Sequence, residues 1–343
     1  MSKVVVTCPN LEHPVKGLDV VNDDRTLDSC VPPDGHHILA EMVLRPINPA
    51  DIFSIMGVYP GFKVSEDGSS CPGLEGLGIV KVGSSKIRVG SKVVGIPWTT
   101  VEEGQGTWQK YLVAHEDDVV VIPEDCNVDD ASLAQLYVNP VTAYGMLDDL
   151  AIPCGEMLLQ TAGGSVLGRM VIQMCKQRNI KTINVVRRQE QVEELKQLGG
   201  DHVIVADEGE SAGITEEVMK ITGGKGAYGA IECVGGTIFK ACASSVRVNG
   251  TIFIYGAMSG LDMTVFIPDP LFRGVSIKGW WLANYIKSKT HEAKQEICRQ
   301  ILGLIELNVV QPCTGSIYEL KDVDKAIEAA TRPARGGKIL LRN

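Results

Sequence analysis

The sequence lacks the features of a membrane-spanning or disulfide-stabilised protein. None of its apolar runs reaches the roughly 18 residues that a membrane-spanning helix needs, so we expect no such helix. Its 10 cysteines are scattered and never form a C-x-x-C pair. Because disulfide frameworks are typical of small secreted domains, we expect reduced thiols that fill the core. The histidines are also dispersed, and we expect no metal site.

Basic residues are outnumbered as well. The chain has 33 Lys and Arg against 42 Asp and Glu, which gives a net charge of −9. Nucleic-acid-binding proteins usually carry a basic excess, so we expect no nucleic-acid partner. The first residues have neither the apolar core of a signal peptide nor the Arg- and Ser-rich character of a transit peptide.

The 343 residues are enough for about two domains, and two patterns divide them. Residues 1–125 contain short β-branched runs separated by Gly and Pro, which predicts a small barrel or sandwich. From about residue 129, strand and helix patterns alternate, and the strands are apolar on both faces. This is typical of a parallel sheet covered by helices on both sides. Short strands return near the C-terminus, so we expect an α/β protein whose dinucleotide-type domain is inserted into a β-rich domain.

A glycine turn follows the first predicted strand of the inserted domain. Gly163, Ser165 and Gly168 fit the pattern G-x-S-x-x-G, one replacement away from the Rossmann G-x-G-x-x-G. The first glycine permits a tight turn, the last allows close packing of helix on strand, and the helix start offers N–H groups to a pyrophosphate. A glycine turn that merely joins a strand to a helix is the alternative.

Two arginines follow the next predicted strand, at 182–186. Arg187 and Arg188 stand about 20 residues after Gly168, where NAD-dependent enzymes usually have Asp or Glu. A guanidinium group forms charge-assisted hydrogen bonds to phosphate, so this pair favours NADPH and hence hydride transfer. A solvated basic start to the following helix is the alternative.

Nine segments of the chain match one known family in the order in which the family has them. They are RPINPADIFSIMGVYP (45–60), PGLEGLGIV (72–80), GTWQKYLVA (106–114), VNPVTAYGML (138–147), AGGSVLG (162–168), TINVVRR (182–188), ECVGG (232–236), IYGAM (254–258) and FRGVSIKGWWL (272–282). Through them the chain resembles the medium-chain dehydrogenase/reductase superfamily, and within it the mitochondrial 2-enoyl thioester reductases. The resemblance implies a GroES-like β-rich catalytic domain at 1–138 and 307–343 and a Rossmann-like, NADP-binding doubly wound domain at 139–306.

The same resemblance implies roles for particular residues. Tyr59 matches the catalytic tyrosine of the family, although a packing tyrosine is the simpler interpretation from the sequence alone. The residues implied to bind NADPH are, at the nicotinamide end, Asn139, Tyr255, Gly256, Ala257, Met258, Trp280, Trp281 and Leu282; in the phosphate loop, Gly163, Gly164, Ser165, Val166, Leu167 and Gly168; at the 2′-phosphate, Arg187, Arg188 and Gln189; and near the C-terminus, Lys338. A core pair for the two tryptophans and a solvated edge lysine for Lys338 are the alternatives.

Three positions depart from the family pattern. Val166 stands where glycine is usual, so its side chain could crowd the pyrophosphate, and Gly145 stands where arginine is common. Leu74 occupies the position of the catalytic histidine of zinc-dependent relatives. Leucine cannot bind zinc, so we expect an enzyme without metal. We expect the neighbouring Glu75 to be a buried hydrogen-bonding acid with no catalytic role.

The resemblance implies NADPH-dependent reduction of trans-2-enoyl thioesters of coenzyme A or acyl carrier protein. Hydride addition at C3 places negative charge on the thioester oxygen, and C2 must then receive a proton. A neutral tyrosine hydroxyl can stabilise the charge and deliver the proton, which is the role expected of Tyr59. An NADPH:quinone oxidoreductase of the same superfamily and an inactive nucleotide-binding protein of the same fold are the alternatives.

Location and assembly are also expectations from the resemblance. It implies a mitochondrial protein if a presequence has been removed, and a cytoplasmic protein otherwise. It also implies a homodimer that pairs through strands of the nucleotide-binding domain. Residues 251–258 and 276–282 are apolar enough to form such an edge.

Overall fold

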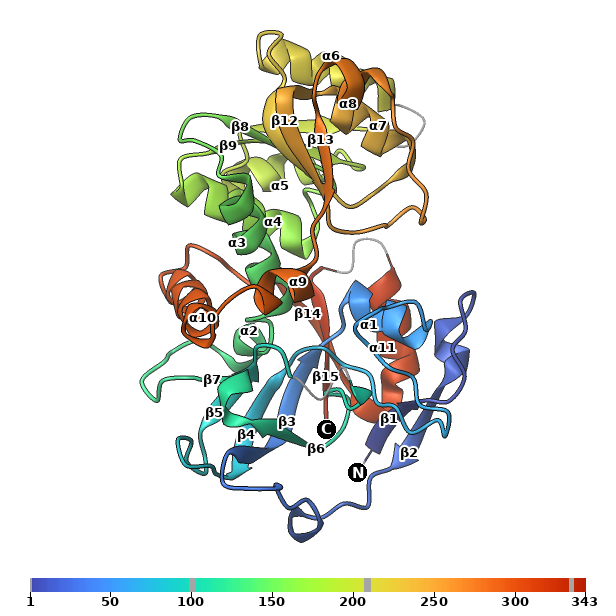
Figure 1. The fold of residues 1–343 in the computed structure, drawn as a ribbon, viewed down its shortest axis with the longest axis vertical. Coiled ribbons are helices and arrows are strands. Elements are labelled where there is room, and N and C mark those ends of the chain that lie inside the picture. The colour runs from blue at the N-terminus through green and yellow to red at the C-terminus, as the bar shows by residue number, and fades with distance from the viewer. Residues whose placement is uncertain (1, 99–102, 207–210, 333–335) are drawn as a thin grey trace. The chain divides into compact units, whose positions relative to one another are not determined.

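A computed structural model describes residues 2–98, 103–206, 211–332 and 336–343. The chain divides into two compact units, one of Met1–Val138 with Lys289–Asn343 and one of Asn139–Ser288 (Figure 1). The chain therefore returns to the first unit at 288/289 rather than at the expected 306/307. The difference is helix α10 (His291–Glu306), whose Gln295 side chain donates a hydrogen bond of 2.8 Å to the carbonyl of Val119 in the first unit.

The first unit is rich in β-strands, and both ends of its sequence contribute to one sheet. This mixed sheet has seven strands in the order β14-β15-β3-β4-β5-β7, with β6 paired to β3. Its C-terminal strand pairs antiparallel with the N-terminal part, Leu340 opposite Pro46, as the expected insertion requires. The strands of the unit are β1 (Ser2–Val6), β2 (Leu18–Asn22), β3 (His37–Pro46), β4 (Leu77–Val82), β5 (Lys92–Gly95), β6 (Tyr111–His115), β7 (Val119–Val121), β14 (Thr314–Glu319) and β15 (Lys338–Arg342).

One helix interrupts the region where only strands were expected. Helix α1 (Pro49–Ile55) begins with proline, whose fixed φ suits the first helical position. Before it, the Asn48 N–H donates a hydrogen bond of 2.7 Å to the carboxylate of Asp51, one half of a capping box. The other helices that lie wholly in this unit are α2 (Asp130–Ala134), α10 and α11 (Val323–Thr331).

The second unit is built on a six-stranded parallel sheet in the order β10-β9-β8-β11-β12-β13. Its strands are β8 (Met157–Gln160), β9 (Lys181–Val186), β10 (His202–Val205), β11 (Ala227–Glu232), β12 (Val246–Ile254) and β13 (Ser276–Gly279). Its helices, the first of which begins one residue before the unit, are α3 (Val138–Leu150), α4 (Val166–Gln177), α5 (Gln191–Leu198), α6 (Ser211–Ile221), α7 (Gly236–Ser244), α8 (Pro268–Phe272) and α9 (Leu282–Lys287).

Strand β9 shows why this sheet is covered on both faces. Ile183 and Val185 pack in one buried cluster with side chains of α6 and α7, including Phe239. Val186 points to the opposite face and packs against Ile172 of α4 and Leu195 of α5. Because successive side chains of a strand alternate between faces, one strand contributes to both layers. The expected doubly covered parallel sheet is confirmed.

Two boundaries of α3 and α7 differ from what the sequence pattern predicts. The run 237–250 predicts one helix, but the helix ends at Ser244 and the rest begins β12, where Val246 and Val248 favour a strand. Pro140 predicts a break within the helical stretch 129–150, but the break falls before it, between Ala134 and Val138, and Pro140 lies inside the first turn of α3. The position is allowed because N–H groups in the first turn have no partner within their own helix.

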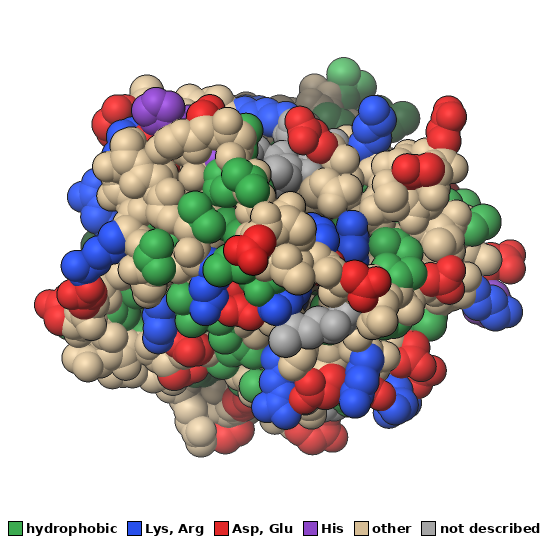
Figure 2. Space-filling view, turned by 90° about the horizontal axis from the view of Figure 1, so that it is seen from below, with side chains coloured by type: hydrophobic (Ala, Val, Ile, Leu, Met, Phe, Trp, Pro, Cys, Tyr) green, Lys and Arg blue, Asp and Glu red, His purple; other side chains and the backbone are tan. Residues whose placement is uncertain are grey.

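The surface carries charge of both signs. On the face shown in Figure 2, Lys and Arg side chains are interspersed with Asp and Glu. Among the helices in the described ranges, none is long and apolar enough to cross a membrane.

Candidate active site

The turn between β8 and α4 contains the glycine residues for which the sequence predicts a phosphate loop. The Gly163 N–H donates to the carbonyl of Val185 at 3.1 Å, which ties the turn to the end of β9. Ser165 caps α4, because its hydroxyl accepts the N–H of Gly168 at 3.0 Å. The helix start therefore presents N–H groups and the positive end of its dipole, an arrangement that binds phosphate.

Gly168 lets α4 approach the turn closely. A Cβ atom at this position would lie 2.7 Å from the carbonyl oxygens of both Ala162 and Gly163. These are backbone atoms, so a side chain here would force the turn itself to move. Val166 and Leu167, the first two helical residues, are both half-buried.

Two residues that the sequence analysis did not select lie against this loop. A Cβ at Gly164 would overlap the side-chain amide of Gln191 at the start of α5. Arg169 donates from Nε to the carbonyl of Gly164 at 3.1 Å and forms an ion pair with Glu194. Helices α4 and α5 thus hold the loop from both sides. Gln191 lies only a few residues beyond Arg187, and that proximity was the available signal.

The end of β9 carries the expected 2′-phosphate residues. Arg187 and Gln189 are exposed, and Arg188 is half-buried. Neither guanidinium forms an ion pair with any residue that the structure describes. Both arginines are therefore available to an anionic ligand.

A buried carboxylate organises the end of β11. Glu232 accepts hydrogen bonds from the N–H groups of Val234 at 2.6 Å and Gly235 at 3.1 Å, and from the hydroxyl of Thr161 at 3.1 Å. Burial raises the pKa of Glu232, while these donors oppose that shift. The three bonds join the carboxyl ends of β8 and β11, the edge at which parallel α/β sheets bind ligands.

The segment Tyr255 to Met258 runs beside this carboxylate. Tyr255 donates its N–H to the carbonyl of Glu232 at 3.0 Å, and Met258 donates to that of Cys233 at 2.8 Å. Gly256 and Ala257 line a small cavity of about 210 Å³. Its remaining lining residues are Glu232, Gly235, Ile254, Gly260, Leu261, Asp262 and Met263. The structure therefore brings Gly256, Ala257 and Glu232 to the same cavity.

The side chain of Trp280 packs inside the second unit and does not face an open surface. Its indole N–H donates to a carboxylate oxygen of Asp149 at 2.7 Å, and the side chain is buried. A Cβ at Gly145 would lie 2.7 Å from the indole ring, so the absence of a side chain at 145 makes room for this tryptophan. Trp281 and Leu282 follow it and are half-buried.

Tyr59 and Lys338 belong to the first unit. Tyr59 follows α1 in a turn, where its N–H donates to the carbonyl of Phe53 at 3.2 Å and its own carbonyl accepts from Phe62 at 3.2 Å. The ring is half-buried at the edge of the main core of the unit. Lys338 is not at a solvated edge: it is buried and donates to the side-chain oxygen of Asn48 at 2.6 Å.

Asn139 belongs to the second unit, together with the glycine turn and the arginines. It is buried in the first turn of α3. Among the described residues, no three or more His, Cys, Asp or Glu side chains form a group able to hold a metal ion.

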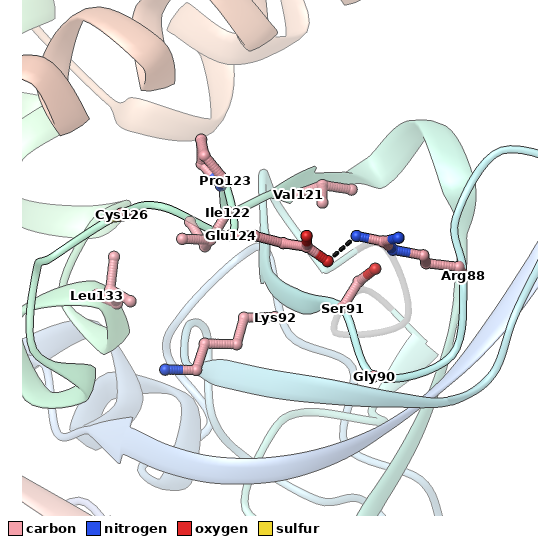
Figure 3. A pocket seen from close by; sticks show the side chains of 10 residues that line it. All are labelled: Arg88, Gly90, Ser91, Lys92, Val121, Ile122, Pro123, Glu124, Cys126 and Leu133. Carbon is pink, nitrogen blue, oxygen red and sulfur yellow. Dashed lines mark ion pairs between the residues drawn. The ribbon is translucent and has the colours of Figure 1, made fainter.

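A larger cavity, of about 510 Å³, lies in the first unit (Figure 3). It is lined by Arg88, Gly90, Ser91, Lys92, Val121, Ile122, Pro123, Glu124, Cys126 and Leu133. None of the expected site residues lines it. Its two cationic side chains are already paired, Arg88 with Glu124 and Lys92 with Asp130.

The parallel sheet, the capped glycine turn and two arginines that form no ion pair with any described residue define a dinucleotide-binding domain. Comparison with known proteins extends this result. Residues 166–300 match the family model of the zinc-binding dehydrogenases. The chain is 31% identical over 314 residues to the mitochondrial enoyl-acyl-carrier-protein reductase of Dictyostelium discoideum, with 89% of this chain and 85% of that protein covered. The chain therefore belongs to the mitochondrial enoyl-acyl-carrier-protein reductase family, within the medium-chain dehydrogenase/reductase superfamily.

Solved structures agree over the whole chain. A complex of Etr1p with NADP and crotonyl-CoA is similar with a TM-score of 0.84 and 26% identity, covering 100% of this chain and 99% of that one. A proposed NADPH:quinone reductase from Bacillus thuringiensis is similar with a TM-score of 0.86 and 29% identity, covering 100% and 98%.

The close approach at Gly168 gives a stability prediction. Replacement by alanine (Gly168→Ala) places a methyl group against two backbone carbonyls, so the free energy of unfolding should fall by about 1–3 kcal/mol. Urea denaturation followed by circular dichroism measures the change.

Gly213→Ala is the matched control in the same unit. Gly213 is exposed in α6, and an added Cβ would meet no atom within 4 Å. Alanine there should stabilise the helix by up to about 1 kcal/mol. Equal stability of the two variants would show that α4 does not need a glycine at position 168.

Proposed function

We propose that this protein is an NADPH-dependent reductase of trans-2-enoyl thioesters, the activity for which its family is named. The observation that carries the proposal is the relationship to the Dictyostelium discoideum reductase across 89% of the chain. The complex of Etr1p with NADP and crotonyl-CoA supports the same cofactor and the same class of substrate. We also place the protein in mitochondria, because the relative is named as a mitochondrial enzyme.

The cofactor would bind along the edge where the parallel strands end. The pyrophosphate would meet the start of α4 at Ser165, and the 2′-phosphate would pair with Arg187 and Arg188. Asn139, Trp281 and Leu282 remain the proposed contacts of the nicotinamide end. Lys338 is withdrawn from this set, because its ammonium is buried against Asn48.

Tyr59 is the proposed acid of the reaction. When bound, NADPH supplies the hydride, which adds to C3 of the enoyl thioester. Negative charge then develops on the thioester oxygen, and a hydroxyl hydrogen bond stabilises it. A phenol is uncharged at pH 7, so Tyr59 can both donate this bond and transfer a proton to C2. Its position in a turn on a helical support suits a reacting group.

Quinone reduction is the second candidate. The Bacillus thuringiensis structure supports it, since its TM-score of 0.86 and identity of 29% are slightly higher than the 0.84 and 26% of the thioester reductase. The two reactions make different demands on the protein. A quinone accepts hydride without proton transfer to carbon, so Tyr59 would not be required for it.

The test of the function compares the wild type with Tyr59→Phe. We expect the wild type to oxidise NADPH in the presence of crotonyl-CoA. The variant should turn over about 10²–10⁴ times more slowly, because it has lost the acid. The decrease in NADPH absorbance measures both rates.

Two further measurements, thermal shift with NADPH and an assay with a quinone, distinguish the proposed reductase from the alternatives. Thermal shift with NADPH alone should be the same for both proteins, which shows that Tyr59→Phe still folds and binds cofactor. Oxidation of NADPH by a quinone but not by crotonyl-CoA would overturn the proposed substrate class. Binding without either turnover would indicate an inactive nucleotide-binding protein.

Replacement of both arginines tests the choice of cofactor. The Arg187→Ser, Arg188→Ser variant should raise KM for NADPH about 10- to 100-fold, because charged hydrogen bonds to phosphate are lost. KM for NADH should not change. Lys181→Ser, at the opposite end of β9, controls for a lost surface charge. Equal use of NADH and NADPH by the wild type would contradict the role of the arginines.

We propose a homodimer formed through the second unit. Strand β13 is at the edge of the parallel sheet. The chain before it exposes large apolar side chains, among them Leu261 at 82% and Phe272 at 78%. An open strand edge beside an apolar surface favours pairing with a second copy.

Light scattering tests this assembly. The wild type should have twice the mass of the 37.0 kDa chain. Phe272→Glu should shift the mass towards the monomer, because it places charge in the apolar surface. Leu307→Glu replaces an equally exposed side chain of the first unit and should remain dimeric. A wild type with the mass of one chain would refute the homodimer.

A further inference from the structure

The first unit contains a buried cluster of charged side chains that the proposed reaction does not use. Asn48, Asp51, Glu75 and Lys338 are 1%, 0%, 0% and 2% exposed. Two carboxyl groups and one ammonium group therefore share a space from which water is excluded. Such groups are costly to bury unless each has a partner, so their hydrogen bonds show what the cluster does.

The side chains of the cluster are linked by a series of hydrogen bonds in which each donor and acceptor is fixed. Lys338 donates to the Asn48 side-chain oxygen at 2.6 Å, and the Asn48 amide donates to one oxygen of Glu75 at 2.8 Å. The other oxygen of Glu75 accepts the backbone N–H of Val138 at 2.8 Å. An ammonium can only donate, so the oxygen of Asn48 must face Lys338 and its NH₂ group must face Glu75. Each member thus determines the orientation of the next.

The series of hydrogen bonds reaches the start of α1 and the start of α3. Asn48 is the residue before α1, and the turn that follows α1 holds Tyr59. Val138 begins α3, and the residue after it is Asn139. The carboxylate of Glu75 is hydrogen-bonded directly both to Asn48, before α1, and to Val138, at the start of α3.

Asp51 strengthens the attachment of α1. Its carboxylate accepts the N–H of Asn48 at 2.7 Å and that of Leu74 at 2.9 Å. Leu74 immediately precedes Glu75, so α1 is bound to this segment by side-chain and backbone bonds. Burial, with a contribution from Glu75, raises the pKa of Asp51 to about 7, and Lys338 opposes the shift.

We propose that Glu75 is a positioning residue that, bonded to Asn48 and Val138 and supported by Lys338, holds the start of α1 in place and so sets the position of Tyr59 for proton transfer. This inference rests on the proposed reductase function. It assigns Glu75 a role although it touches neither substrate nor cofactor. Precise placement of reacting groups matters because a displacement of about 1 Å can cost about 10²-fold in rate.

Glu75→Gln tests the proposal with little change in volume. A glutamine has one oxygen and one NH₂, so one of its two donor partners, Asn48 or Val138, must face another donor. We expect kcat with crotonyl-CoA to fall about 10- to 100-fold while the dissociation constant of NADPH stays the same. The kinetic isotope effect with NADPH deuterated at the transferred position should rise, because the chemical step becomes slower.

Glu116→Gln is the matched control. Glu116 is also a buried carboxylate of the first unit, but it is bonded to His36, Ser85 and Lys86. Its replacement should lower the melting temperature without changing kcat or the isotope effect. Equal kinetics of the two variants would overturn the proposal, because Glu75 would then only stabilise the fold.

Lys338→Met provides an independent readout through pH. Besides Asn48, the titratable groups around Glu75 are Asp51, Lys338 and Tyr137, whose phenol is uncharged because burial raises its pKa. Lys338 lowers the pKa of Glu75 and of Asp51. Loss of the ammonium raises both values, so more protonated carboxyl is present at a given pH. The acidic limb of the kcat profile should therefore move to higher pH.

The controls separate this proposal from the proposed function. A wild type without crotonyl-CoA reductase activity refutes the function itself. An active wild type with an unmoved acidic limb in Lys338→Met refutes the positioning network alone. Lys338→Met also keeps the test decisive if Glu75→Gln is insoluble.

Discussion

The arrangement of the second unit depends on one close contact between backbone atoms. Helix α4 begins directly against the turn after β8, and Gly168 permits this because it has no side chain. The contact directs the helix start towards the end of the sheet, where Ser165 caps it. Gln191 and Arg169 contact the turn from adjacent helices, and the Gly163 N–H bonds the turn to the end of β9, after which Arg187 and Arg188 follow. A ligand with several phosphates fits a place where backbone N–H groups and side-chain cations converge.

In both units a buried carboxyl group joins separate segments by accepting hydrogen bonds from them. Glu232 accepts three hydrogen bonds where β8 and β11 end, and Glu75 accepts two where α1 and α3 begin. In each case a buried carboxyl group accepts a hydrogen bond from at least one segment distant in the sequence, Thr161 for Glu232 and Val138 for Glu75. Removal of such an acceptor leaves several donors without partners, so these groups define conformation more than they add to stability.

The sequence was most informative where local periodicity agrees with tertiary packing. The alternating strands and helices from β8 to β11 were predicted because their apolar residues and glycines mark each boundary. Helix α1 was missed because it is only two turns long and depends on Asp51 and Pro49 for its start. The start of β12 was assigned to the preceding helix, since VRVNG has no turn residue before it to mark a change.

The candidate site was predictable in part for the same reason. The glycine turn and Arg187 follow a motif with fixed spacing, so the sequence identifies them directly. Gln191 contacts the loop because α5 folds back over Gly164, and its closeness to Arg187 in the sequence is the one local sign of that contact. Lys338 was interpreted from its flanking residues as a cofactor contact or a solvated lysine. Its actual partner, Asn48, is distant in the sequence, and only the folded structure brings the two together.

The packing of Trp280 on Gly145 has a consequence for how such proteins can diverge. Any side chain larger than hydrogen at 145 collides with the indole, while a smaller residue at 280 would leave a void and an unpaired Asp149. Mutational paths that exchange this pair must therefore shrink position 280 before they enlarge position 145. The two sites should be epistatic, and their order of replacement during evolution should be constrained.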